Sequence, residues 1–269
     1  MKKMSLLISI LMLIILTVGC SKMAANSVSN VSSINFKSTQ SKHDESALPE
    51  SENESENYMT KENKAPELIY FGHASMCIIT EDNKVIYIDP YEKGDYSRAA
   101  DLILVTHDHF DHNQIEKVEN RNENCEIITQ AEALVNGEYK TFELPFVNVE
   151  AVEAGNNPNH DINFCVGYIL TFKNGRTVYI SGDTSTTDQM SELGSKNIDY
   201  AFFCCDGVYN MDIEEAAKCA KTVGAKHNIP YHNETANGEL LNKELAEDWS
   251  VPNKMIVIPG ESINIDDGI

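Results

Sequence analysis

The residues of the chain most able to do chemistry lie in one short stretch, 106–112. It contains His107, His109, Asp111 and His112, and three of the eight histidines of the chain are among them. Imidazole nitrogen and carboxylate oxygen are ligands of zinc and its first-row neighbours, so the stretch predicts a metal site. Alternate side chains of an extended loop point the same way. His107 and His109 can therefore converge on one cation while Asp111 and His112 turn towards a second.

Three later residues can complete a pair of metals, and each lies just after an apolar run: His160, Asp183 and His232. Strand ends gather at one edge of a sheet, where sites are usually built, so dispersed positions can meet there. His160 is chosen partly because no other histidine lies between His112 and His227. The neighbours of His227 indicate the start of a strand rather than a ligand loop.

Two further residues lie close to the predicted ligands in this pattern. His73 is expected near the metals, where it would hold structure or substrate rather than ligate. Asp89 follows an apolar run and has two interpretations that we weigh equally. It is either a turn residue at a strand end or an acceptor for the second N–H of a ligand histidine, a partner that metal sites commonly need.

The elements that must position these residues are mostly short strands separated by turn residues. Strands are predicted at 68–71, 76–80, 85–89, 101–106, 126–129, 141–144, 147–152, 165–172, 177–181, 200–204, 226–229 and 255–258. A helix is predicted after Asp212, which can cap it, with Gly224 closing it. A second helix is expected within 239–249. Strands and helices are therefore mixed, and the histidine cluster lies at the C-terminal end of the strand 101–106.

The N-terminal residues 1–20 are typical of a bacterial lipoprotein signal. Lys2 and Lys3 precede a mostly apolar run at 6–18, which is too short to span a bilayer comfortably. The run ends in Gly19-Cys20, which resembles a lipobox, where the cysteine becomes the acylated first residue of the mature protein. A plain cleaved signal and a membrane-anchor helix are the alternatives.

The next segment, 21–65, is rich in Ser, Asn, Glu, Lys and Thr, which predicts a disordered tether. The folded domain is therefore predicted at 66–269, a length that suits one domain. With lipid on Cys20, the protein would be anchored to the cell membrane and face away from the cytoplasm.

The composition bounds the partners. A formal net charge of -21, from 42 acidic and 21 basic residues, argues against binding a nucleic-acid backbone, which needs clustered Lys and Arg. The expected partner is a small-molecule substrate. Six cysteines besides Cys20 fall mostly in apolar runs and form no C-x-x-C pair. Core packing is favoured for them, although disulfides stay possible in an extracytoplasmic protein.

The chain resembles the metallo-β-lactamase superfamily, and within it the branch similar to L-ascorbate-6-phosphate lactonase and related metal-dependent hydrolases. The resemblance covers nearly all of residues 66–262. It rests on Phe71-Gly72-His73-Ala74-Ser75, Ile88-Asp89-Pro90-Tyr91, the stretch 106–112, Gly167-Tyr168, Tyr179-Ile180-Ser181-Gly182-Asp183-Thr184, Ile229-Pro230-Tyr231-His232 and Pro259-Gly260-Glu261. The histidine motif and the Gly-Asp-Thr are specific to the superfamily, whereas the Gly-His-Ala and Pro-Gly-Glu pieces are weak alone.

The resemblance implies an α/β (α+β) fold, a four-layer αββα sandwich of two mixed sheets flanked by helices. It also implies two divalent metal ions, with zinc favoured and manganese the alternative. Carried over position by position, one metal takes His107, His109 and His160, and the other takes Asp111, His112 and His232. Asp183 would bridge the two.

Such a pair of metals would lower the pKa of a water held between them and so give a hydroxide nucleophile near neutral pH. Asp111 could orient that water and accept its proton, with His109 beside it. The predicted function is hydrolysis of an ester, lactone, amide or phosphoester bond. Four loops are candidates for substrate contact: 91–98, 156–163, 207–210 and 233–237. The alternative is a non-catalytic, metal-dependent binding or sensor lipoprotein with the same fold.

Overall fold

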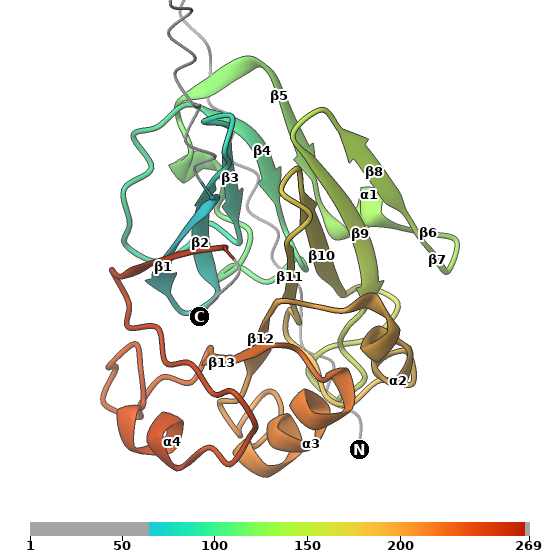
Figure 1. Ribbon diagram of the computed structural model, residues 1–269, viewed down its shortest axis with the longest axis vertical. Helices are drawn as coiled ribbons and strands as arrows, with labels where there is room; N and C mark the ends of the chain where they lie inside the picture. The colour runs from blue at the N-terminus through green and yellow to red at the C-terminus, as the bar shows by residue number, and fades with distance from the viewer. Residues whose placement is uncertain (1–64, 267–269) are drawn as a thin grey trace, which may run out of the picture. The chain divides into compact units, whose positions relative to one another are not determined.

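The computed structural model describes residues 65–266, and Figure 1 shows how their strands and helices are arranged. The predicted lipoprotein signal, its Cys20 and the tether up to residue 64 lie outside the described residues. Within the described range, no helix is both long and apolar enough to cross a membrane. The architecture is built on two six-stranded sheets and a small two-stranded one.

The first sheet contains the N-terminal strands and one strand from the C-terminal end. Its order is β14 (Ser262–Asn264), β1 (Glu67–Gly72), β2 (Ser75–Ile79), β3 (Val85–Ile88), β4 (Ala100–Leu104) and β5 (Arg121–Ile128). Neighbours are antiparallel from β14 to β3 and parallel from β3 to β5. The sheet is therefore mixed.

The second sheet repeats this sequence of strand directions. Its order is β8 (Thr141–Leu144), β9 (Val147–Glu153), β10 (Val166–Phe172), β11 (Thr177–Ile180), β12 (Tyr200–Cys204) and β13 (His227–Tyr231). Neighbours are antiparallel from β8 to β11 and parallel from β11 to β13. The two-stranded sheet pairs β6 (Leu134–Val135) with β7 (Glu138–Tyr139).

The main core lies between the two large sheets and draws alternate residues from each. In β3, Ile86 and Ile88 belong to this core, whereas Val85 and Tyr87 belong to a second cluster on the other face of the sheet. Side chains alternate between the faces of a strand. Both faces of β3 are therefore buried, and the strand reads in the sequence as a continuous apolar run.

Different layers cover the outer faces of the two sheets. On the second sheet, α3 (Ile213–Val223) packs against β12, and α2 (Met190–Leu193) packs against α3, as Figure 1 shows in orange. On the first sheet, the second apolar cluster is closed by Tyr96 and Val118 together with the 3-10 helix η1 (Ile115–Lys117). The predicted sandwich of two mixed sheets is confirmed, and its outer layer over the first sheet is largely irregular.

The helix α3 begins and ends where the sequence predicts. The Asp212 carboxylate accepts a hydrogen bond from the Glu215 backbone N at 2.8 Å, and Gly224 ends the helix with a φ of +67°. The other predicted helix, expected within 239–249, is shorter in the structure: α4 spans Lys243–Asp248. Among the described residues, four short helices were not predicted: α1 (Gln130–Ala133), η2 (Gly194–Lys196), and α2 and η1 described above.

One predicted strand is wrong. Residues 255–258 form no strand, although the Met255 backbone N donates to the Asn228 carbonyl of β13 at 2.8 Å, next to an isolated bridge between Asn228 and Lys254. The C-terminal strand is instead β14, which pairs with the edge strand β1. The six described cysteines are free, and all but Cys125 are buried, which agrees with the packing role expected for them.

Candidate metal centre

The predicted ligands come from the ends of strands in both sheets. The stretch 106–112 follows β4 of the first sheet. Asp183 follows β11, and His232 comes directly after β13, both in the second sheet. His160 lies in the loop between β9 and β10. The structure brings these side chains together in one cluster, in which Asp183 Oδ2 lies within 3.6 Å of nitrogens of His112, His160 and His232.

The first group of histidines consists of His107, His109 and His160, whose ring nitrogens lie within 4.8 Å of one another. His107 and His160 are buried, whereas His109 is exposed. Burial, with the neighbouring His112 adding to it, lowers the pKa of His107 to about 2. Burial also lowers the pKa of His160. Both rings are therefore neutral at physiological pH and can offer a lone pair to a cation.

Asp183 lies between this group and the other histidines. Its Oδ2 is 3.4 Å from His160 Nε2, 3.6 Å from His112 Nε2 and 3.3 Å from His232 Nε2. Burial alone would raise the pKa of Asp183, but His232 and His112 outweigh that effect and hold the pKa well below its usual value. A single ionised carboxylate thus contacts histidines on both sides of the cluster.

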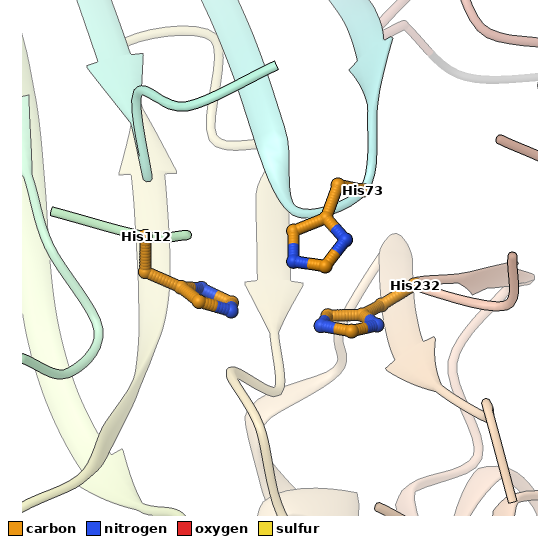
Figure 2. Close-up of side chains that lie close together, drawn as sticks. All are labelled: His73, His112 and His232. Carbon is orange, nitrogen blue, oxygen red and sulfur yellow. The ribbon is translucent and has the colours of Figure 1, made fainter. Parts of the chain in front are cut away.

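The second group of histidines consists of His73, His112 and His232, which again have ring nitrogens within 4.8 Å of one another. Figure 2 shows the three rings turned towards a common space from three separate segments. His73 comes from the turn between β1 and β2. The rings of His73 and His232 lie 3.8 Å apart, centroid to centroid. The sequence placed His73 near the site, and the structure puts it inside the second group.

Asp89 is fully buried at the end of β3 and connects the strand ends of the first sheet. Its Oδ2 accepts hydrogen bonds from His112 Nδ1 at 2.9 Å and from the Thr106 hydroxyl at 2.7 Å. Its Oδ1 accepts from the Thr106 backbone N at 2.8 Å. Of the two interpretations of Asp89, the geometry is that of an acceptor for a histidine in the cluster. The residue also makes a turn, with a φ of +43°.

Glu234 is a member of the site that the sequence did not reveal. Its Oε1 is 2.9 Å from His73 Nδ1, and its Oε2 is 3.3 Å from His232 Nδ1. Burial alone would raise the pKa of Glu234, but these histidines outweigh burial and hold it below its usual value. The only signal in the sequence was its position two residues after His232, inside a loop predicted to contact substrate.

Asp111 faces the second group from the same loop as His112. Its Oδ2 lies 3.4 Å from His73 Nε2. Burial alone would raise the pKa of Asp111, but His73 and His112 lower it below its usual value. Asp111 is part of no three-residue group of donors within 4.8 Å among the described residues. It nevertheless lines the same cavity as Asp183 and His232.

The residues present fit divalent cations. Several buried polar atoms have no hydrogen-bond partner, namely the Nε2 atoms of His73, His107, His112 and His232 and the Oδ1 of Asp183. Leaving such atoms unpaired is costly, so they indicate an ion between them. The 3.3 to 3.6 Å separations around Asp183 also match a metal polyhedron. Ligands about 2.0–2.1 Å from a tetrahedral cation lie about 3.4 Å apart.

A cavity of about 820 Å³ opens onto five of the seven predicted ligands. Its lining includes His109, Asp111, His160, Asp183 and His232, together with Asp108, Phe110, Pro158, Asn159 and Tyr209. Phe110 and Tyr209 are 73% and 61% exposed and form an aromatic rim. Two of the loops predicted to contact substrate, 156–163 and 207–210, therefore contribute to the cavity wall.

Comparison with known proteins supports this reading of the cluster. Residues 67–232 match the family model of the beta-lactamase superfamily domain. The UPF0173 metal-dependent hydrolase of Pyrococcus furiosus is 30% identical over 229 residues, which cover 73% of this chain and 98% of that protein. The one from Thermodesulfovibrio yellowstonii is 29% identical over 249 residues, covering 75% and 93%.

Solved structures agree with the same assignment. A candidate metal-dependent hydrolase from Parabacteroides distasonis is 32% identical and superposes with a TM-score of 0.59, covering 74% of this chain and 96% of that one. The metallo hydrolase Igni18 of Ignicoccus hospitalis, at 22% identity, has the same fold with a TM-score of 0.59 over 76% of this chain and all of the other. The chain therefore belongs to the beta-lactamase superfamily and, within it, to the UPF0173 metal-dependent hydrolases.

Proposed function

We propose that the chain hydrolyses an uncharged ester, lactone or amide with two divalent cations, zinc or manganese, held by His107, His109, Asp111, His112, His160, Asp183 and His232. The observation that carries the proposal is the position of Asp183, which contacts histidines on both sides of the cluster at the wall of an open cavity. An ionised carboxylate so placed suits a bridging ligand. The family's relatives carry the name metal-dependent hydrolase, which agrees with metal-assisted hydrolysis here.

When bound, the two cations would supply an activated water and polarise the bond to be cleaved. The chain supplies the proton acceptor. Asp111 is ionised, borders the cavity and has its Oδ2 3.4 Å from His73 Nε2. It can therefore orient the attacking water and take its proton. His109 is the exposed histidine of the cluster and lines the same cavity, where it can contact the substrate.

The cavity lining supports an uncharged substrate. None of the described residues that line the cavity is a lysine or an arginine, whereas Asp108, Asp111 and Asp183 are acidic. A phosphate group would find no arginine or lysine there and would have only the two cations to pair with. The aromatic rim of Phe110 and Tyr209 offers contact to an apolar substituent instead. The resemblance suggests a lactone substrate. A lactone that carries no phosphate group fits this lining better than a phosphorylated one.

The test is a panel of esters, lactones, amides and phosphodiesters assayed with zinc and manganese separately, using the purified full-length protein. We expect close to two equivalents of metal and hydrolysis of uncharged members, with Asp111→Ala or His109→Ala reducing turnover to background. Metal content near zero after reconstitution, or full activity in those variants, would contradict the proposal. Two bound metals without turnover of any substrate would favour the binding or sensor alternative.

We further propose that the enzyme is attached to the cell membrane through lipid on Cys20 and faces away from the cytoplasm. Support comes from the sequence alone: two lysines, a short apolar run and Gly19-Cys20. Cys20→Ala should leave the protein unprocessed or release it from membranes, as fractionation and the mass of the mature N-terminus would show. A processed Cys20→Ala protein that stays membrane-bound would rule out acylation at this residue.

A further inference from the structure

We propose that His73 is itself a ligand of the second cation, an eighth protein donor held in its ligating orientation by Glu234. The inference rests on the two-cation function proposed above, and it assigns His73 a role that the sequence did not. It follows from where the two nitrogens of the His73 ring lie.

The inner nitrogen of His73 points at the second group. Its Nε2 is buried and has no hydrogen-bond partner, as is also true of the Nε2 atoms of His112 and His232. The three rings approach one another from the β1–β2 turn, the loop after β4 and the end of β13, as Figure 2 shows. One ring nitrogen from each of the three histidines lies within 4.8 Å of the other two, which makes the group a donor set for one cation.

The outer nitrogen of His73 has the partner expected for a ligand. Metal-binding histidines almost always donate their second N–H to a carboxylate, a backbone carbonyl or water. In this group a carboxylate stands behind every ring: Glu234 is 2.9 Å from His73 Nδ1, Asp89 accepts from His112 Nδ1 at 2.9 Å, and Glu234 also lies 3.3 Å from His232 Nδ1, outside hydrogen-bond geometry. His73 therefore has the same environment as the two histidines already expected to ligate.

With its Nδ1–H directed at Glu234, a neutral His73 ring has no second N–H to donate to Asp111. If Nδ1–H donates to Glu234, Nε2 carries a lone pair, and that lone pair faces Asp111 Oδ2 at 3.4 Å. Two acceptors at this distance repel each other unless a cation lies between them. The separation also exceeds the roughly 2.7–2.9 Å of a charge-assisted hydrogen bond and matches the ligand spacing of a metal site.

Backbone conformation gives independent support. His73 and His232 are both in the left-handed region, with φ values of +51° and +48°. This conformation is uncommon for residues other than glycine, and such strain concentrates at functional sites. Glu234 contacts the rings of both strained residues. The two turns thus bring both rings to the same carboxylate, with ring centroids 3.8 Å apart.

The experiment uses the full-length protein loaded with cobalt(II), whose unpaired electrons shift the ring N–H protons of ligating histidines far outside the normal NMR range. We compare wild type, His73→Gly and a control, His227→Ala. Glycine at position 73 tolerates the positive φ, so the backbone has no reason to refold. His227 stacks on Tyr200 away from the cluster and tests the loss of a histidine as such.

We expect His73→Gly to lose one shifted, exchangeable resonance and to bind the cobalt ion of the second group more than about 100-fold more weakly, because losing even an outer partner costs roughly 10- to 100-fold. Added imidazole should restore cobalt binding at the second group. His227→Ala should match wild type. If wild type takes up two cobalt ions and His73→Gly retains every shifted resonance, the ligand assignment is wrong. If wild type does not take up two ions, the two-cation function itself fails.

Discussion

The two groups of histidines differ in what stands behind their rings. In the second group, His73, His112 and His232, each outer nitrogen faces a carboxylate, Glu234 or Asp89. In the first group the acceptors are neutral: His107 Nδ1 is 3.2 Å from the Thr106 hydroxyl, and His160 Nδ1 is 3.3 Å from the Asn157 amide oxygen. His109, the third member, is exposed.

The difference predicts unequal metal sites. A carboxylate behind a histidine raises the basicity of the ring and fixes its orientation. The second group also has Asp111 beside it, so it concentrates more negative charge in a more buried place. We therefore expect the second site to fill first and to release its ion last. The first site, next to the exposed His109, should exchange its ion more readily.

The largest effect should come from removing Asp183, because it is shared by both groups. Asp183→Ala should abolish hydrolysis and lower the metal content of the purified protein at both sites. The matched control is Asp188→Ala, an exposed aspartate five residues along the chain. Metal analysis by mass spectrometry and a turnover assay measure the result. Loss of only one ion with Asp183→Ala would show that the two groups do not share this carboxylate.

A smaller and one-sided effect is expected from Asp89→Asn. The asparagine keeps one acceptor for Thr106 but removes the charge beside His112, so affinity at the second site should fall roughly 10- to 100-fold. Isothermal titration with zinc would show the tighter of the two binding events weakened. Asp101→Asn is the control, a buried aspartate bonded to Lys84 and Asn122 outside the cluster. Equal weakening of both events would contradict the asymmetry.

The smallest effect should come from Asn157→Ala, which removes a neutral acceptor behind His160. Because no charge is lost, we expect the first site to weaken by less than about 10-fold, with the second unchanged. The same titration measures it, and Asn163→Ala, another asparagine of that loop, serves as the control. An effect as large as that of Asp89→Asn would mean that acceptor charge does not distinguish the two sites.

The spacing of the donors along the chain explains which parts of the site could be predicted from the sequence. The four donors after β4 are close in the chain, so residue type and spacing alone suggested a site. His160, Asp183 and His232 are dispersed along the chain. They were found because each lies after an apolar run, and each of these runs is a strand in the structure. The strands were predictable because buried strands are visible as apolar runs, whereas the superfamily fold was predicted from the resemblance of the motifs.

What escaped prediction depends on contacts between distant segments. Glu234 is one of many acidic residues, and only the fold shows that its two oxygens meet His73 and His232. The role of Asp89 stayed open because a turn and an acceptor have the same sequence pattern. The strand predicted at 255–258 was wrong because an apolar run forms a strand only where it pairs with the edge of a sheet. The C-terminal segment that pairs with the edge strand β1 is 262–264.

The position of Asp183 has a consequence for the stability of the molecule as well as for its chemistry. His107 and His112 belong to the first sheet, whereas Asp183 and His232 belong to the second, so ions held among them cross-link the two halves of the sandwich. Anything that binds the native state and not the unfolded chain shifts the folding equilibrium. Metal starvation would then lower the melting temperature, and the supply of metal would govern how much folded protein persists.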